Sequence, residues 1–152
     1  MASSVSADLL KQLSAASQSI NQATDEFNEQ IRFIEDALAS YNIGVSAWVH
    51  AYTDSVEEYN EIGEVRGTID TNYSLGYQRA GSNWSLLVAS ECDYGCAPGK
   101  SDRTEWVFRD APRRIRIKAV TAIPKLLEAL IAEANRLAAE VSKHTKQARA
   151  FA

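Results

Sequence analysis

The fold is decided by one short stretch of sequence, residues 42–52, which reads NIGVSAWVHAY. Asn42 and Gly44 are typical stop signals for a preceding helix, because both residue types accept the left-handed backbone that ends helices. From Val45 to Tyr52, small and large side chains alternate, which is typical of a β-strand. The chain is therefore expected to change from helix to sheet at this point.

The alternation gives this strand two different faces. The small face is expected to point inward, because small side chains let a helix approach a sheet closely; it consists of Val45, Ala47, Val49 and Ala51. The large face, joined by a tyrosine from a later strand, is a candidate aromatic binding face, since aromatic residues are enriched at binding surfaces. A packing role is the alternative, because aromatics are equally common on half-buried sheets. The candidate set is Trp48, His50, Tyr52 and Tyr77.

Residues 7–41 are predicted to form one long amphipathic helix with Ser6 as its N-cap. Apolar residues recur at steps of three and four, which is a coiled-coil-like seam with one irregular 4–4 step. At a rise of about 1.5 Å per residue the helix is roughly 50 Å long, so part of it must pack on a partner helix, within the chain or in another copy. The seam consists of Leu9, Leu13, Ala16, Ile20, Ala23, Phe27, Ile31, Ile34, Leu38 and Tyr41.

Residues 45–108 are predicted to form an antiparallel β-meander of about four strands. After the first strand, an acidic connection is expected over residues 54–64. Two strands, 73–79 and 84–90, are joined by a tight turn at 81–83, where Gly and Asn supply the backbone angles of a hairpin. A loop over 93–102 and a last strand over 103–108 complete the predicted meander.

Residues 111–147 are predicted to form a second long helix, which begins at the capping carboxylate of Asp110 and is kinked or split near Pro124. Residues 113–120 also alternate like a strand, and this alternative stays open. The two terminal helices are expected to pair antiparallel, which gives a single α+β domain over residues 1–152. The second seam is predicted to be Ile117, Val120, Pro124, Leu127, Ile131, Ala134, Leu137 and Val141.

Composition excludes several classes of protein. The chain has 152 residues, of which 45% are hydrophobic, so global disorder is not expected. Its net charge of −4 does not suit a generic nucleic-acid binder, because phosphate neutralisation requires a basic surface. No signal peptide and no apolar run of about 18 residues is recognised, so a cytoplasmic protein without a membrane partner is expected.

No motif predicts a catalytic centre, a cofactor or a metal site. Cys92 and Cys96 are separated by three residues, where a thioredoxin-like redox site needs two. Incidental thiols, a regulatory disulfide and a metal site remain alternatives, although only His50 and His144 could add imidazole ligands. The acidic run over 57–64 lacks the calcium-loop pattern and is expected to be a solvated loop.

Four cations gather near the start of the second helix, at Arg113, Arg114, Arg116 and Lys118. Cations at this end oppose the helix dipole, so something should compensate them. One alternative is pairing with the acidic connection or with Glu91, Asp93 and Glu105. The other is a site for an anionic or nucleotide-like ligand.

The order of coiled-coil helix, strands and coiled-coil helix resembles prefoldin-type chaperone subunits in arrangement alone. No diagnostic motif is matched, so no family is claimed, and the resemblance implies only a holdase-like chaperone as one alternative. The leading expectation is a non-enzymatic binding protein that forms a homodimer or higher homo-oligomer through its helices, since unpaired seams would expose apolar patches. A separate protein partner, a small-molecule binder and a modest enzyme using the aromatic face and the basic cluster are further alternatives.

Overall fold

The computed structural model describes residues 2–94 and 101–151. The chain divides into two compact units, Met1–Tyr41 and Asn42–Ala152. The first unit is one helix, and the second contains an antiparallel sheet followed by helices. The predicted α+β class is therefore confirmed. The single domain and the pairing of the terminal helices concern the relation between the units and stay predictions.

The first unit is the helix α1 (Ala2–Tyr41). The prediction that Ser6 caps it is wrong, because the helix already includes the residues before Ser6. Its predicted end is confirmed. Asn42 and Gly44 adopt positive φ angles of 47° and 63°, which turn the chain out of the helix.

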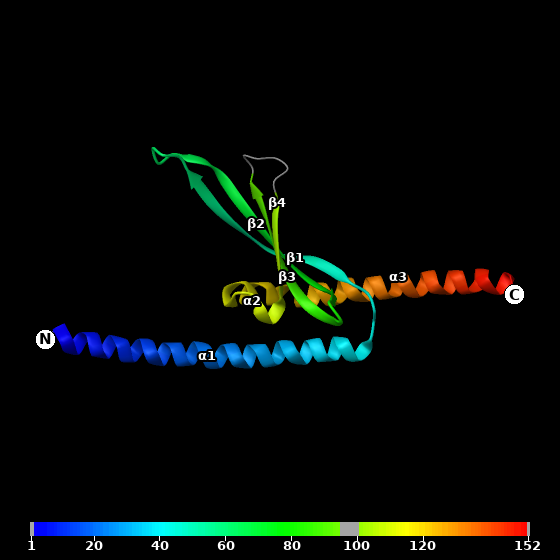
Figure 1. Cartoon of the computed structure of the whole chain (residues 1–152), viewed down its shortest axis with the longest axis horizontal. Helices are drawn as coiled ribbons and strands as arrows, with labels where there is room; N and C mark the ends of the chain where they lie inside the picture. Colours follow the sequence, from blue (N-terminus) through cyan, green and yellow to red (C-terminus); the bar gives the residue numbers. More distant parts are fainter. Residues whose placement is uncertain (1, 95–100, 152) are drawn as a thin grey trace. The chain divides into compact units, whose positions relative to one another are not determined.

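The sheet contains β1 (Ala47–Tyr59), β2 (Val65–Ala80), β3 (Asn83–Tyr94) and β4 (Ser101–Val107) in the order β1-β2-β3-β4 (Figure 1). The predicted meander is confirmed, with Gly81 at a φ of 66° in the β2–β3 turn. The acidic connection predicted over 54–64 is shorter than expected, because β1 runs on to Tyr59 and only residues 60–64 connect it to β2, which starts at Val65. Within the predicted loop over 93–102, residues 95–100 lie outside the described residues.

A β-bulge at Ala51 interrupts the pairing of β1 with β2. His50 pairs with Ser74, but Tyr52 pairs with the next residue of β2, Tyr73. Ala51 is therefore one extra residue on β1, and the side chains after it change face. Tyr52 consequently shares a face with Val49, and the strict alternation that the sequence predicts ends at the bulge.

The C-terminal part of the second unit is helical but not one helix. A short 3-10 turn, η1 (Phe108–Asp110), leads to α2 (Arg113–Ala119), a second turn η2 (Val120–Ala122) and α3 (Ile123–Ala150). The helical alternative for residues 113–120 is thus confirmed. Pro124 lies in the first turn of α3, so the helix is split rather than kinked. The prediction of a capping carboxylate at Asp110 is wrong, because Pro112 is the N-cap of α2 and no side chain caps it.

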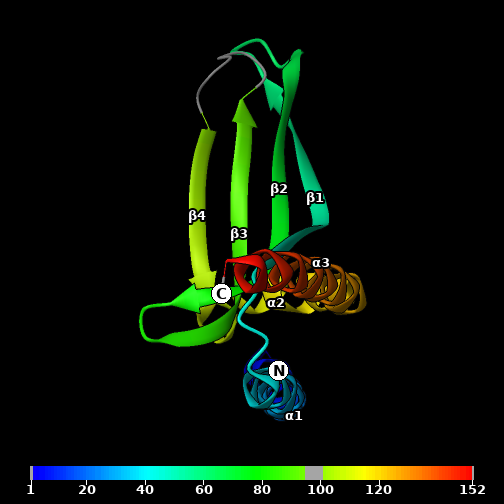
Figure 2. The ribbon, with the colours of Figure 1, turned by 90° about the vertical axis from the view of Figure 1, so that its right-hand side faces the viewer.

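Helices α2 and α3 cross the sheet near one end, as Figure 2 shows. The core between them is apolar, and each large side chain that is fully buried stabilises the fold by about 1.5–3 kcal/mol. Val45 and Val49 of the predicted small face are buried, whereas Ala47 and Ala51 are half-buried. The other core residues of the sheet, η1 and the helices include Leu75, Tyr77, Leu86, Val88, Phe108, Ala119, Ala122, Ile123, Leu126 and Leu130.

The stripe of α3 that packs on the sheet differs from the predicted seam. Leu126 and Leu130 are buried, whereas Ile131 of the predicted seam is 61% exposed. The sequence has adjacent apolar residues at 126–127 and at 130–131. Helical periodicity therefore fits either stripe, and only the position of the sheet decides between them.

Trp48 depends on the glycine opposite it on β2. The two residues pair across the strands, and a Cβ atom added to Gly76 would overlap the indole ring. Glycine is thus required here by the close approach of a side chain rather than by an unusual backbone angle.

We expect Gly76→Ala to lower the free energy of unfolding by about 1–3 kcal/mol, because the indole must leave its place to make room. Gly67→Ala on the same strand is the matched control, since nothing lies within 4 Å of its added Cβ. Urea denaturation of both variants measures the difference. Equal stabilities of the two variants would contradict the steric role of Gly76.

Candidate functional site

One cluster of polar and aromatic side chains lies where α2 approaches the sheet. The rings of Tyr52 and Tyr73 stack with centroids 4.4 Å apart and planes 9° apart. The Lys118 ammonium nitrogen lies 5.0 Å from the centroid of the Tyr52 ring. The same nitrogen donates a hydrogen bond of 2.7 Å to Oδ1 of Asp54. These four residues are the tyrosine–lysine cluster.

The bulge and the helical repeat bring the cluster together. Tyr52 and Asp54 are two residues apart on β1, so both point to the face that the bulge has turned toward α2. Lys118 and Arg114 are four residues apart on α2 and therefore share one side of that helix. The cluster thus joins a residue from the predicted aromatic face with one from the predicted basic cluster.

Burial raises the pKa of both phenols of the cluster. It raises the pKa of Tyr52 to about 12, with smaller contributions from Tyr73 and Asp54. The pKa of Tyr73 is raised as well, mainly by burial and then by Asp54. Near neutral pH these phenols can donate hydrogen bonds but cannot act as bases.

The ion pair in the cluster is partly exposed. The side chains of Lys118 and Asp54 are 37% and 40% exposed, so solvent screens their attraction and the pair is worth about 0–1 kcal/mol. Its main effect is local. The carboxylate matches the ammonium charge, so Lys118 is not available as an uncompensated cation for a ligand.

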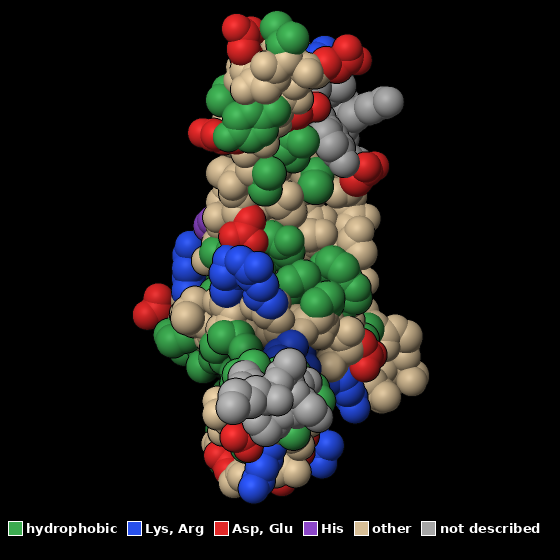
Figure 3. Space-filling view, turned by 90° about the vertical axis from the view of Figure 1, so that its left-hand side faces the viewer, with side chains coloured by type: hydrophobic (Ala, Val, Ile, Leu, Met, Phe, Trp, Pro, Cys, Tyr) green, Lys and Arg blue, Asp and Glu red, His purple; other side chains and the backbone are tan. Residues whose placement is uncertain are grey.

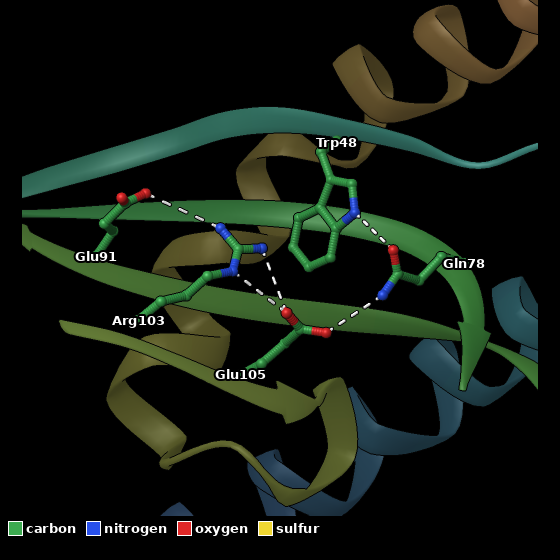
Figure 4. A network of polar contacts seen from close by, with 5 residues as sticks. All are labelled: Trp48, Gln78, Glu91, Arg103 and Glu105. Carbon is green, nitrogen blue, oxygen red and sulfur yellow. Dashed lines mark hydrogen bonds and ion pairs between the residues drawn. The ribbon is translucent and has the colours of Figure 1, made fainter. Parts of the chain in front are cut away.

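A second network lies on the opposite face of the sheet (Figure 4). Trp48 Nε1 donates to Oε1 of Gln78 at 2.9 Å, and Gln78 Nε2 donates to Oε1 of Glu105 at 3.2 Å. Arg103 donates twice to Oε2 of Glu105, at 3.3 Å each, and its guanidinium lies 5.0 Å from the centroid of the Trp48 ring. Arg103 also pairs with Glu91 at 4.0 Å. We call this set the Trp48–Arg103 network.

This network mainly supports packing. The indole lies against Gly76 and under the guanidinium, and its N–H is already used by Gln78. Arg103 faces two carboxylates, which balance its charge. The arrangement therefore covers the sheet and orients a tryptophan, and it contains no nucleophile held next to a base.

The structure does not bring the predicted aromatic face together. Trp48 and His50 lie on the face of the Trp48–Arg103 network, whereas Tyr52 and Tyr77 lie on the helix-covered face. Tyr77 is 2% exposed and belongs to the core. His50 is exposed, with Nε2 3.4 Å from the hydroxyl of Thr53.

The predicted basic cluster is divided as well. Arg116 is 8% exposed, while Arg113 and Arg114 are exposed and Lys118 binds Asp54. Pairing with the acidic segment is thus confirmed for Lys118. The expected partners Glu91 and Glu105 pair with Arg103 instead.

Sequence reasoning missed three residues of these clusters: Tyr73, Gln78 and Arg103. A signal for the last was present, because Arg103 and Glu105 alternate on a predicted strand and therefore share one face. Gln78 and Tyr73 carry no such signal, since their roles depend on the register between strands.

The described part of the chain contains no group of three or more His, Cys, Asp or Glu side chains placed to hold a metal ion. Cys92 is a free thiol 3.3 Å from the hydroxyl of Thr71, and Cys96 lies outside the described residues. Among the helices over the described ranges, none has an apolar stretch that would reach across a bilayer.

Comparisons of the chain with models of known protein families, with curated proteins and with solved structures found no match. A function for this chain is therefore proposed from its geometry.

The raised pKa of Tyr52 predicts a pH dependence of stability. From pH 10.0, the ordinary pKa of tyrosine, to about pH 12, the folded state binds more protons than the unfolded state. The free energy of unfolding therefore falls as pH rises through this range, and the contribution is complete below it. We expect Tyr52→Phe to show a smaller fall than wild type in denaturation series from about pH 9 to about pH 12.

Tyr41→Phe is the matched control, since that side chain on α1 is 71% exposed. This variant should follow the wild-type pH dependence. Titration of tyrosine absorbance gives a second measurement, in which Tyr52→Phe should remove a group that ionises late. A missing group with a midpoint near 10 would contradict the assignment.

Proposed function

We propose that this chain is a non-enzymatic binding protein that assembles with copies of itself through its long helices. One observation carries the proposal. The stripe of α3 that packs on the sheet continues past the sheet as an apolar stripe exposed to water.

The stripe follows from the helical repeat. At about 100° per residue, Leu126, Leu130, Leu137 and Val141 lie on one side of α3. The first two are buried, but Leu137 is 39% exposed and Val141 is 56% exposed. The second half of α3 therefore presents the same kind of surface that its first half buries, with the four- and seven-residue steps of a helical interface.

The helix α1 presents a similar stripe. Leu9, Leu13 and Ile20 are 60%, 66% and 51% exposed. They occupy one side of the helix at coiled-coil spacing, within the seam that the sequence predicts. Each long helix thus has a segment whose apolar side is exposed to solvent.

A comparison of burial energy with the cost of association favours an assembly that uses both helices. Complete burial of one large apolar side chain is worth about 1.5–3 kcal/mol, and association costs about 4–15 kcal/mol. Leu137 and Val141 are partly covered already, so one pair of α3 stripes gives too little to hold two copies together. The stripe of α1 supplies the additional area that a stable assembly requires.

The alternative of an anionic ligand site has less support. Its four predicted cations do not converge, since Arg116 is buried and Lys118 is matched by Asp54. The exposed helical stripes are the more extensive unexplained feature, and monomeric proteins rarely leave such surfaces uncovered.

We expect the double variant Leu137→Glu, Val141→Glu to reduce assembly at least tenfold, because charges would enter an apolar interface. Size-exclusion chromatography with light scattering measures the mass over a range of concentrations. The matched control is Asn135→Glu, Ala139→Glu, which adds the same charge to the opposite side of α3, where both residues are exposed. A wild-type chain that stays monomeric at all concentrations would contradict the proposal.

A further inference from the structure

We propose that a projecting arm between β1 and β2, residues 57–68, docks onto the basic C-terminal end of α3, residues 141–151, of a second copy of the chain. The proposal goes beyond assembly through the helical stripes, because it adds a second contact made by other residues.

The arm is the part of the β1–β2 hairpin that extends beyond β3. Pairing of β2 with β3 begins only at Ile69, so Glu57 with Thr68 and Tyr59 with Val65 pair in a two-stranded ribbon. Figures 1 and 2 show this ribbon reaching past the ends of β3 and β4, away from α2 and α3. Isolated two-stranded ribbons are marginally stable in water, so an arm of this kind benefits from a partner.

Hydrogen bonds with Asn60 close the turn at the tip of the arm. Oδ1 of Asn60 accepts hydrogen bonds from the backbone N–H groups of Ile62 and Glu64, at 3.1 and 2.8 Å. The backbone N–H of Asn60 donates to the carbonyl of Glu64 at 2.8 Å, and Gly63 takes a φ of 79°. This turn presents the Ile62 side chain to solvent with 80% of its surface exposed.

The arm combines apolar and acidic side chains. Tyr59 and Val65 are 58% and 56% exposed, next to the exposed Ile62 at the tip. Four glutamates and one arginine occupy residues 57–66, so this segment carries a net charge of −3. Figure 3 shows red and green side chains together over this end of the sheet. The acidic residues are Glu57, Glu58, Glu61 and Glu64.

These charges select the chemistry of the partner. Glutamates repel phosphate, so neither nucleic acid nor an anionic membrane surface suits the arm. A surface that matches it must offer cations beside apolar contacts. Electrostatic complementarity of this kind determines which surfaces associate and how fast they do so.

The end of α3 has the required chemistry. Residues 141–151 contain Lys143, Lys146 and Arg149 but no Asp or Glu. At about 100° per residue, the two lysines lie on the side of α3 away from Leu137 and Val141, so pairing through the apolar stripe leaves them accessible. Phe151, 92% exposed, adds an apolar contact next to these cations.

The two surfaces of one copy cannot meet each other. In Figures 1 and 2 the arm and the C-terminal end of α3 extend from the sheet in different directions. The contact must therefore join different copies and use two different patches. One such contact joins copies head to tail into rings or open chains, and a reciprocal exchange of arms between two copies closes a pair.

Charge exchange between the surfaces tests the proposal. The arm variant is Glu57→Lys, Glu61→Lys, Glu64→Lys, and the helix variant is Lys143→Glu, Lys146→Glu, Arg149→Glu. Wild type and variants are treated with a zero-length carbodiimide, which joins carboxylates to amines in contact. Mixing isotopically labelled and unlabelled chains identifies the cross-links between copies by mass spectrometry.

We expect cross-links between the arm and residues 141–151 of another copy in the wild type. Each variant alone should lose them at least tenfold, because like charges then face each other. A mixture of the two variants should regain them, since the basic arm of one meets the acidic helix of the other. Absence of these cross-links in the wild type, or failure of the mixture to regain them, would overturn the proposal.

A control matched to the arm variant has the same change in net charge on α1. The variant Asp25→Lys, Glu29→Lys, Asp36→Lys should keep the wild-type cross-links, and circular dichroism should show equal helix content in all variants. Loss of the cross-links in this control would show that net charge alone drives association and would overturn the proposal.

Salt separates this contact from assembly through the stripes. Raising ionic strength from about 0.05 M to about 0.5 M should abolish the arm cross-links, because exposed charges are screened, and should leave stripe-mediated mass unchanged. If the chain assembles at all salt concentrations but shows no arm cross-links at low salt, docking of the arm is refuted and assembly through the stripes stands. If the arm cross-links form at low salt but the chain is monomeric at high salt, assembly through the stripes is refuted and docking of the arm stands.

Discussion

The one-residue bulge at Ala51 determines what each half of β1 contributes to the protein. Before the bulge, Val49 enters the core. After it, Tyr52 and Asp54 turn to the face that α2 covers, where Lys118 reaches both of them. Without the extra residue these side chains would join Trp48 on the other face, and Lys118 would lose its carboxylate and the ring beneath it. The tyrosine–lysine cluster and the separation of the aromatic residues therefore have the same cause.

The parts of the fold that depend on local signals could be predicted from the sequence. The end of α1 at Tyr41 follows from residue types that accept positive φ, and the β2–β3 turn follows from Gly81. The acidic half of β1 could not be predicted in this way, because glutamate is depleted in strands. Its stability comes from contacts across the sheet, such as the 2.6 Å bond from Ser55 to Asp70, which join residues distant in sequence.

The candidate site was less predictable, since it depends on register and on relative position. Lys118 could be expected to find a carboxylate, but its partner is 64 residues away and is fixed by the path of β1. Arg103 carries a weaker sequence signal than the cations of residues 113–118, because those form a run whereas Arg103 stands alone between carboxylates. Periodicity also could not choose between Leu130 and Ile131 for the core, because both are apolar and the sheet alone decides.

The two proposed contacts depend on different interactions, and they can therefore form independently of each other. Association through apolar stripes depends on buried area and tolerates salt, whereas docking of the arm depends on complementary charge and is screened. A contact between like stripes can close into a symmetric pair, but the arm and the end of α3 are different patches. Because Lys143 and Lys146 face away from Leu137 and Val141, one contact does not block the other. Pairs formed through the helices would therefore still carry free arms and free basic ends, and the charge-dependent contact would control whether those pairs join into larger assemblies.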